Sequence, residues 1–192
     1  MRFIPLQKFK AMKKAAYALL FASTLFISCE DEVNDPPIPN EEEVITTLSY
    51  TLTGAGSVHT FTFQDLDGDG GNAPSITVDT ITSGVTYSGS LTLLNEIENE
   101  DVTIEIFEEA EEHQFFFQSS DPALSVSYDD DDENQQPIGL LSVLSASDPG
   151  DYSLTITLRH EPDKSAAGVS DGDITNAGGE TDIEVTFQIH VL

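Results

Sequence analysis

Three of the four histidines of this chain lie where an imidazole could bind a metal ion. His113 follows an acidic run that ends at Glu112, and His59 and His160 are in phase with the apolar residues of predicted strands. If these strand ends meet, His59, His113 and His160 could bind a transition metal, with Glu112 as a further ligand. The alternative is that each is an ordinary strand-end histidine, with no shared site.

A second candidate is the segment Asp65-Leu66-Asp67-Gly68-Asp69-Gly70. Carboxylates at alternate positions of a tight turn converge on one point, as in the first half of a calcium loop. Ile76 stands where an EF-hand has its bidentate glutamate, and the flanking segments are predicted strands, so the segment is not an EF-hand. Two interpretations remain: a hairpin that holds Ca²⁺ through Asp65, Asp67 and Asp69, or a solvated turn.

The third candidate is a loop with a concentrated positive charge. Arg159 and Lys164 are the only permanent cations after residue 28. They lie at the start of residues 161–180, a Gly-, Ser- and Asp-rich segment that predicts a long connection without regular structure. Such loops are usually functional or disordered. Arg159 and Lys164 could receive an anionic ligand, or they could organise the loop's own acids, among them Asp171 and Asp173.

The composition argues against catalysis and against nucleic acid. The chain has no His-Glu-x-x-His and no phosphate-binding loop, so we predict that it is not an enzyme. Its 192 residues include 35 acidic and 7 basic ones, a formal net charge of −28. Repulsion from phosphate excludes nucleic acid and anionic lipid surfaces as partners.

Residues 1–28 predict a lipoprotein signal peptide, with Met12 as an alternative start. Five of the seven basic residues precede an apolar run that is too short to span a bilayer. The run leads to Leu25-Phe26-Ile27-Ser28 and then to Cys29, the only cysteine. This pattern resembles the lipobox of bacterial lipoproteins, which implies that the thiol of Cys29 carries a lipid anchor in the membrane.

Residues 29–43 predict a tether between the lipid and the folded domain. The acidic residues repel one another and the prolines keep the chain extended. Acidic residues directly after a lipidated cysteine resemble the surface-export signal of Bacteroidota lipoproteins. We therefore expect a location on the outer membrane, with the cell surface favoured over the periplasmic face.

Residues 44–192 predict one all-β domain. Apolar and polar residues alternate with a period of two, and Gly-, Asp- and Asn-rich turns separate the runs. The clearest run, residues 181–191, places Ile183 and Val185 on one face and Asp182 and Glu184 on the other. The spacing predicts an antiparallel β-sandwich, immunoglobulin-like, with a helical turn only at 108–112. Strands are predicted near 46–53, 57–64, 75–82, 85–94, 102–107, 113–118, 124–128, 138–144, 152–158 and 181–191.

Several segments together resemble a known family. They are Glu42 to Leu48, Asp65 to Gly70, Glu111 to Phe115, Leu158 to Pro162 and Gly168 to Val185. These segments are similar to small acidic lipoproteins of Bacteroidota that are commonly labelled "type 1 periplasmic binding fold superfamily protein". The resemblance implies a lipid-anchored envelope protein and brings no settled activity with it.

These observations predict a cell-envelope binding module. It would capture a metal ion or a small ligand for an outer-membrane transporter, and a TonB-dependent receptor would be the natural partner. The alternative is a structural or adhesive surface lipoprotein with a calcium-stapled sandwich and no dedicated ligand. A third interpretation, a glycan-binding sandwich, would depend on Tyr87 or Tyr128.

Overall fold

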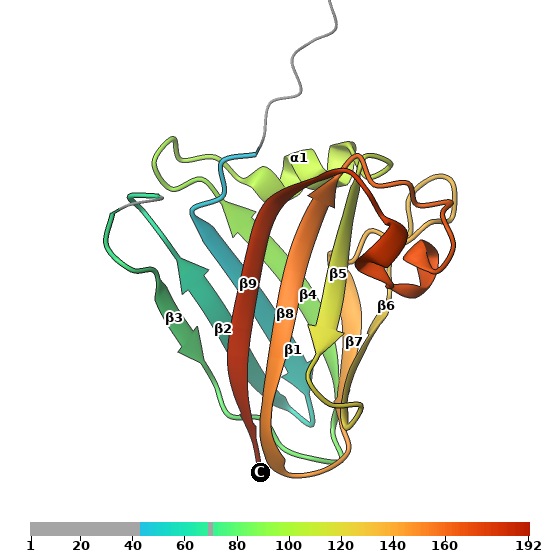
Figure 1. Ribbon diagram of the computed structural model, residues 1–192. Helices are drawn as coiled ribbons and strands as arrows, with labels where there is room; N and C mark the ends of the chain where they lie inside the picture. Colours follow the sequence, from blue (N-terminus) through green and yellow to red (C-terminus); the bar gives the residue numbers. More distant parts are fainter. Residues whose placement is uncertain (1–42, 69–70) are drawn as a thin grey trace, which may run out of the picture. The chain divides into compact units, whose positions relative to one another are not determined.

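The computed structural model describes residues 43–68 and 71–192, and it contains two β-sheets, one short α-helix and two 3₁₀ helices (Figure 1). The predicted signal peptide, Cys29, all of the tether before Glu43, and Asp69 lie outside the described residues. The elements in chain order are β1 (Thr47–Gly54), β2 (Ser57–Gln64), β3 (Ser75–Val78), β4 (Thr86–Leu94), α1 (Val102–Glu108), β5 (His113–Ser119), β6 (Leu124–Tyr128), β7 (Leu141–Ala146), β8 (Gly150–His160), η1 (Val169–Asp171), η2 (Ile174–Asn176) and β9 (Glu180–Val191).

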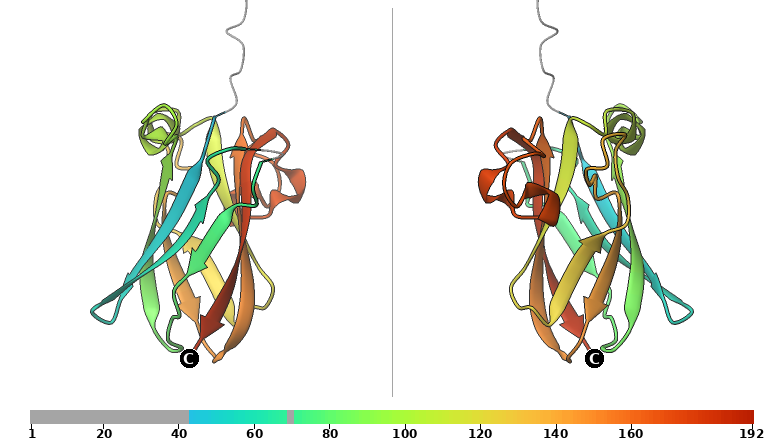
Figure 2. Two further views of the ribbon diagram at one scale, coloured as in Figure 1. Left: turned by 90° about the vertical axis from the view of Figure 1, so that its left-hand side faces the viewer. Right: turned by 90° about the vertical axis from the view of Figure 1, so that its right-hand side faces the viewer.

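The strands form a two-layered antiparallel sandwich. One sheet has six strands in the order β3-β2-β1-β4-β7-β6, and the other has three in the order β5-β8-β9. Figure 2 shows the two layers edge-on, with α1 at one end of the sandwich. The prediction of an antiparallel β-sandwich is confirmed. The six-and-three division differs from the four-and-three division of a constant-type immunoglobulin domain.

The core lies between the sheets and follows the alternation in the sequence. In β9 the side chains of Ile183, Val185, Phe187, Ile189 and Val191 are all buried. Aromatic rings join the layers, since Phe61 of β2 lies 5.8 Å from Phe187, centroid to centroid. Such contacts between large apolar side chains supply most of the favourable free energy of folding in a protein of this kind.

Among the described residues, no helix is long and apolar enough to cross a membrane.

Residues 102–107 form the helix α1, so the predicted strand there is wrong. The alternation of Val102, Ile104 and Ile106 suits a strand, but the spacing of Val102 and Ile106 also suits one face of a helix, and these two are buried. The side chain of Asp101 favours the helix locally, because it accepts a hydrogen bond from the backbone N–H of Thr103 at 3.1 Å and caps the helix. The helical turn predicted at 108–112 overlaps the helix only at Glu108, and residues 109–112 form a non-helical turn.

The segment 161–180 is not the structureless connection that its composition suggests. It contains η1 and η2, and Val169 and Ala177 pack with Phe116 of β5 in a small second core. The side chain of Gln114 donates a buried hydrogen bond to the carbonyl of Val169 at 2.8 Å. The segment therefore covers the part of the three-stranded sheet's outer face that carries Gln114 and Phe116. The bounds of two strands differ from the prediction. The strand predicted near 75–82 ends at Val78, and the strand predicted near 138–144 begins at Leu141.

Candidate metal centre

Two of the predicted histidines face each other across β5 and β8. His113 is the first residue of β5 and pairs directly with His160, the last residue of β8. Side chains of directly opposed residues lie on the same face of a sheet. The two rings stack with their centroids 4.5 Å apart and their planes 26° apart. His113 is fully buried and His160 is 4% exposed, so the pair belongs to the protein interior.

Asp182 joins this pair because of a bulge in β9. Ile183 pairs with Leu158 and Thr181 pairs with Arg159, so Asp182 is the extra residue between two registered pairs. Its side chain is fully buried. The prediction from strand alternation, which placed Asp182 on the solvent face, is therefore wrong. The distance from His113 Nε2 to Asp182 Oδ2 is 3.9 Å. One ligand atom each of His113, His160 and Asp182 lies within 4.8 Å of the other two.

The tautomer of His113 is set by the backbone. Its Nδ1 donates a hydrogen bond to the carbonyl of Glu109 at 3.1 Å, because a carbonyl oxygen can only accept. The lone pair is then on Nε2, which is buried and has no hydrogen-bond partner among the described residues. Burial, with a smaller effect of His160, lowers the pKa of His113 to about 4, although the bond to Glu109 works against the shift. His113 is therefore a neutral imidazole at neutral pH, the form that binds metals.

His160 carries two buried polar atoms without partners. Neither Nδ1 nor Nε2 makes a hydrogen bond within the described part of the chain. Oε2 of Glu112 lies 3.7 Å from Nε2, a separation beyond hydrogen-bonding distance. Buried nitrogens without a partner are rare and costly in folded proteins, and a bound ion at such a position would remove the cost.

Further carboxylates extend the cluster. Glu43, Glu109 and His113 form a second group whose ligand atoms lie within 4.8 Å of one another, and Glu112, His160 and Glu161 form a third. Burial, followed by the charges of Glu105, Asp182 and Glu109, raises the pKa of Glu43 to about 7. The three groups thus overlap at the two histidines.

Backbone contacts fix the strand ends that carry the cluster. The N–H of Glu161 donates to the carbonyl of Glu112 at 2.6 Å, which closes the end of β5 against the end of β8. Gly179 lies so close to this turn that a Cβ on it would be 2.1 Å from the carbonyl oxygen of His160. Its φ of +67° is also one that glycine adopts without strain. The start of β9 can therefore approach the histidines closely.

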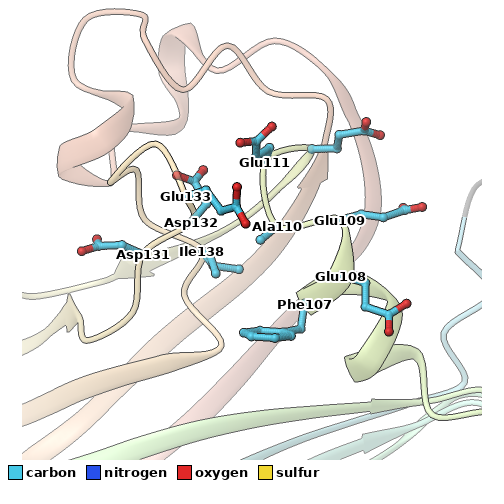
Figure 3. Close-up of a pocket in the computed structure, with 10 residues that line it drawn as sticks. Phe107, Glu108, Glu109, Ala110, Glu111, Asp131, Asp132, Glu133 and Ile138 are labelled. Carbon is cyan, nitrogen blue, oxygen red and sulfur yellow. The ribbon is translucent and has the colours of Figure 1, made fainter.

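An acidic cleft of about 520 Å³ lies beside the cluster. Phe107, Ala110 and Ile138 supply its apolar lining, and Figure 3 shows Glu108 and Glu109 extending to one side while Asp131 extends to the other. The acidic residues that line it are Glu108, Glu109, Glu111, Glu112, Asp131, Asp132 and Glu133. Glu109 and Glu112 line the cleft and also belong to the groups that contain His113 and His160.

One buried ion pair borders this cleft. Nζ of Lys164 donates to Oδ2 of Asp132 at 2.9 Å and to the carbonyl of Ala110 at 2.6 Å. Burial lowers the pKa of Lys164. Burial alone would raise the pKa of Asp132, but the Lys164 hydrogen bond and backbone N–H groups hold it below its usual value. Lys164, predicted as part of a ligand loop, thus ties residues 161–180 to the loop after β6.

The other members of the predicted ligand loop are engaged separately. The guanidinium of Arg159 donates to the carbonyls of Gly178 and Gly179 and to the hydroxyl of Thr181. Asp173 caps η2 by accepting from the backbone N–H of Thr175, and hydrogen bonds from the side chain and the backbone of Thr175 lower the pKa of Asp173. Asp171 lies in η1. Arg159 and Lys164 thus bind different partners.

Residues 168–172 read Gly-Val-Ser-Asp-Gly, which matches the Gly-x-Ser-x-Gly pattern of serine hydrolases. In those enzymes the serine lies on a sharp turn between a strand and a helix. Here the serine lies in the short 3₁₀ helix η1, between two glycines in the left-handed conformation. The backbone context of a nucleophilic serine is therefore missing at this position.

His59 lies away from the stacked pair. Its Nε2 is 2.9 Å from the hydroxyl of Ser57, and its ring meets Tyr87 edge-on at 5.6 Å. It belongs to none of the three metal-competent groups found among the described residues. Tyr87 is 1% exposed and offers no open face to a sugar. Tyr128 is half-buried, and its hydroxyl donates to the carbonyl of Phe115 at 2.7 Å.

The two described acids of the predicted calcium loop bind the loop itself. Asp65 Oδ1 accepts from the N–H groups of Asp67 and Gly68, at 3.2 and 2.9 Å. Asp67 Oδ2 accepts from the backbone and side-chain amides of Asn72, and these bonds lower the pKa of Asp67. Calcium binding through Asp65, Asp67 and Asp69 stays a prediction.

Comparison of the chain with protein-family models, with curated proteins and with solved structures gave no match. Function must therefore be inferred from the cluster itself. Its three innermost members come from β5, β8 and β9. The acidic run before His113 and the phase of His160 singled out these two histidines in the sequence. The position of Asp182 depends on a bulge, for which the alternation of residues gives no signal.

Proposed function

We propose that this protein is a cell-envelope binding module that captures a divalent transition-metal ion through His113, His160 and Asp182. The observation that carries the proposal is the pair of buried, stacked imidazoles with unpartnered ring nitrogens beside a buried carboxylate. An ion bound there would provide these nitrogens with the partner that burial otherwise denies them.

The ligand set points to the class of metal. Two imidazoles and a carboxylate suit Zn²⁺, Fe²⁺ and related ions, whereas Ca²⁺ and Mg²⁺ prefer ligand sets made of oxygen. In a tetrahedral zinc site with bonds of ~2.0–2.1 Å, neighbouring ligand atoms are ~3.3 Å apart. The 3.9 Å between His113 Nε2 and Asp182 Oδ2 is close to this value, so a small side-chain rotation would bring these two ligand atoms to it.

The proposed location is supported by the sequence, and the proposed partner is chosen to suit that location. Cys29, at the end of a lipoprotein-like signal, would attach the domain to the outer membrane, and residues 29–43 would act as the tether. The strongly acidic composition supports the collection of cations near the envelope. A TonB-dependent receptor is the transporter to which a captured ion would be passed.

The test is thermal unfolding of the full chain in neutral detergent, after chelator treatment and addition of single ions. A ligand at a hundred times its Kd stabilises the folded state by ~2.7 kcal/mol. We expect a large rise in melting temperature with Zn²⁺ or Fe²⁺ and a small one with Ca²⁺ or Mg²⁺. His113→Gln, His160→Gln and Asp182→Asn should abolish the large rise.

His190→Gln is the matched control, because His190 is 55% exposed at its side chain and bonds Asp151 away from the cluster. Isothermal titration of each variant that folds then separates lost binding from lost stability. Equal small shifts for every ion, unchanged in His113→Gln and Asp182→Asn, would mean generic screening of negative charge and would refute a dedicated site.

A further inference from the structure

The group of Glu112, His160 and Glu161 is more exposed than the innermost group of His113, His160 and Asp182. One ligand atom each of Glu112, His160 and Glu161 lies within 4.8 Å of the other two. The side chain of Glu112 is 57% exposed, whereas that of His160 is 5% exposed. Glu161 is also an exposed residue. The group therefore combines two carboxylates that water can reach with one buried imidazole.

The buried, unbonded ring nitrogens of His160 indicate a ligand at this position. Its Nε2 is 3.7 Å from Oε2 of Glu112 and makes no hydrogen bond within the described part of the chain. A protonated imidazole would gain a direct bond to such a carboxylate, and a neutral one leaves its lone pair available for a cation. The bond from the N–H of Glu161 to the carbonyl of Glu112 holds the two acidic residues side by side at the strand ends.

The acidic cleft leads to this group. Glu112 lines the cleft, together with six other carboxylate-bearing residues. Clefts with walls of one charge concentrate counter-ions and raise their association rates by 10–10³-fold. A divalent cation drawn into the cleft can therefore reach Glu112, which is exposed, whereas the side chains of His113 and Asp182 are buried.

His160 connects the surface to the interior, because it belongs to the outer group and to the innermost group alike. We propose that Glu112, His160 and Glu161 form an outer subsite for divalent transition-metal ions, through which an ion passes from the acidic cleft to His113 and Asp182. This inference rests on the proposed function, since it assigns a loading route to the same centre. The carboxylates of Glu112 and Glu161 first replace water molecules around the ion. The ion then moves inward while His160 remains one of its ligands.

The test is stopped-flow absorbance of the full chain in neutral detergent with Co²⁺, whose visible bands report ligation by nitrogen and oxygen. Glu112→Gln and Glu161→Gln keep the size of the side chain and remove the charged ligand. Glu133→Gln is the matched control, because Glu133 lines the same cleft and belongs to none of the three groups. We expect the two outer variants to load at least about tenfold more slowly than the control, with an unchanged final spectrum.

The outcomes separate the two proposals. If the parent protein gives no Co²⁺ bands, or if His113→Gln keeps them, the proposed function fails and the outer subsite fails with it. If the parent binds Co²⁺ but Glu112→Gln and Glu161→Gln load as fast as Glu133→Gln, the outer subsite alone is overturned. Slower loading with the same equilibrium Kd supports a kinetic role for these two glutamates.

Discussion

Lys164 is a buried cation whose ammonium group is held by one carboxylate and one carbonyl. Its side chain is 7% exposed and that of Asp132 is 1% exposed. Removal of one partner from a buried pair costs ~3–5 kcal/mol, because the other charge is left without compensation. We expect Lys164→Met to lower the free energy of unfolding by about that amount in urea titrations.

The double variant Lys164→Met/Asp132→Asn is the control for this prediction. An asparagine can still accept from the N–H groups of Asn134 and Gln136, which bond Asp132 Oδ1 at 2.9 Å each. The double variant should recover part of the loss, since no uncompensated charge remains. A loss below about 1 kcal/mol in the single variant would show that the pair behaves like a surface ion pair.

The same pair predicts how stability depends on pH. The pKa of Asp132 is lower in the folded protein than its usual value of ~3.9. Above that value both states are ionised and the stabilisation is complete. As the pH falls below it, the unfolded chain binds the proton first, so stability is lost down to the folded pKa. Urea unfolding between neutral and acid pH should show this loss, with a shallower fall in Asp132→Asn; parallel curves would contradict it.

At the scale of elements, α1 depends on a single cap. Asp101 accepts from the N–H of Thr103, and the hydroxyl of Thr103 bonds β4 through the carbonyl of Leu93 at 3.1 Å. Replacement of an N-cap aspartate by alanine costs ~1 kcal/mol. Asp101→Ala should lose about this much in urea titrations, whereas Glu100→Ala, next to the cap, should lose much less. Equal effects would show that charge, not capping, matters here.

Strands whose apolar residues clearly alternate could be predicted from the sequence. Segments whose apolar residues fit both a strand and a helix could not. The alternation in β8 and β9 predicted their buried faces and placed His160 on the apolar side. Val102, Ile104 and Ile106 satisfy both a strand and a short helix, so the sequence pattern alone could not decide. The bulge that turns Asp182 inward depends on pairing with β8, a contact between distant segments that local periodicity does not contain.

At the scale of the whole molecule, the all-β architecture was predictable because almost every segment alternates. The metal-competent cluster was predictable only in part: His160 was in phase with the apolar residues and His113 followed an acidic run, but the association of β5 with β8 is a matter of topology. His59 had the same phase and lies elsewhere. Phase identifies the face of a strand, and only the sheet order identifies its neighbours.

The lipid anchor gives a prediction at this scale. Cys29→Ser removes the thiol that the signal-like segment predicts to be lipidated. In a bacterial host that processes lipoproteins, we expect the parent protein in the membrane fraction and the Cys29→Ser protein outside it, because the acyl chains supply the membrane affinity. Fractionation and mass spectrometry of the amino terminus would measure this. Equal membrane association of both proteins would contradict the anchor.

The direct pairing of His113 with His160 also bears on folding. A slip of one residue between β5 and β8 would turn the side chains of one strand to the opposite face and separate the two rings. The innermost ligands come from three strands and are far apart in the unfolded chain, so only the correct register assembles them. A bound ion would therefore stabilise the sheet with the correct strand register, and forms with a shifted register would not gain this stabilisation.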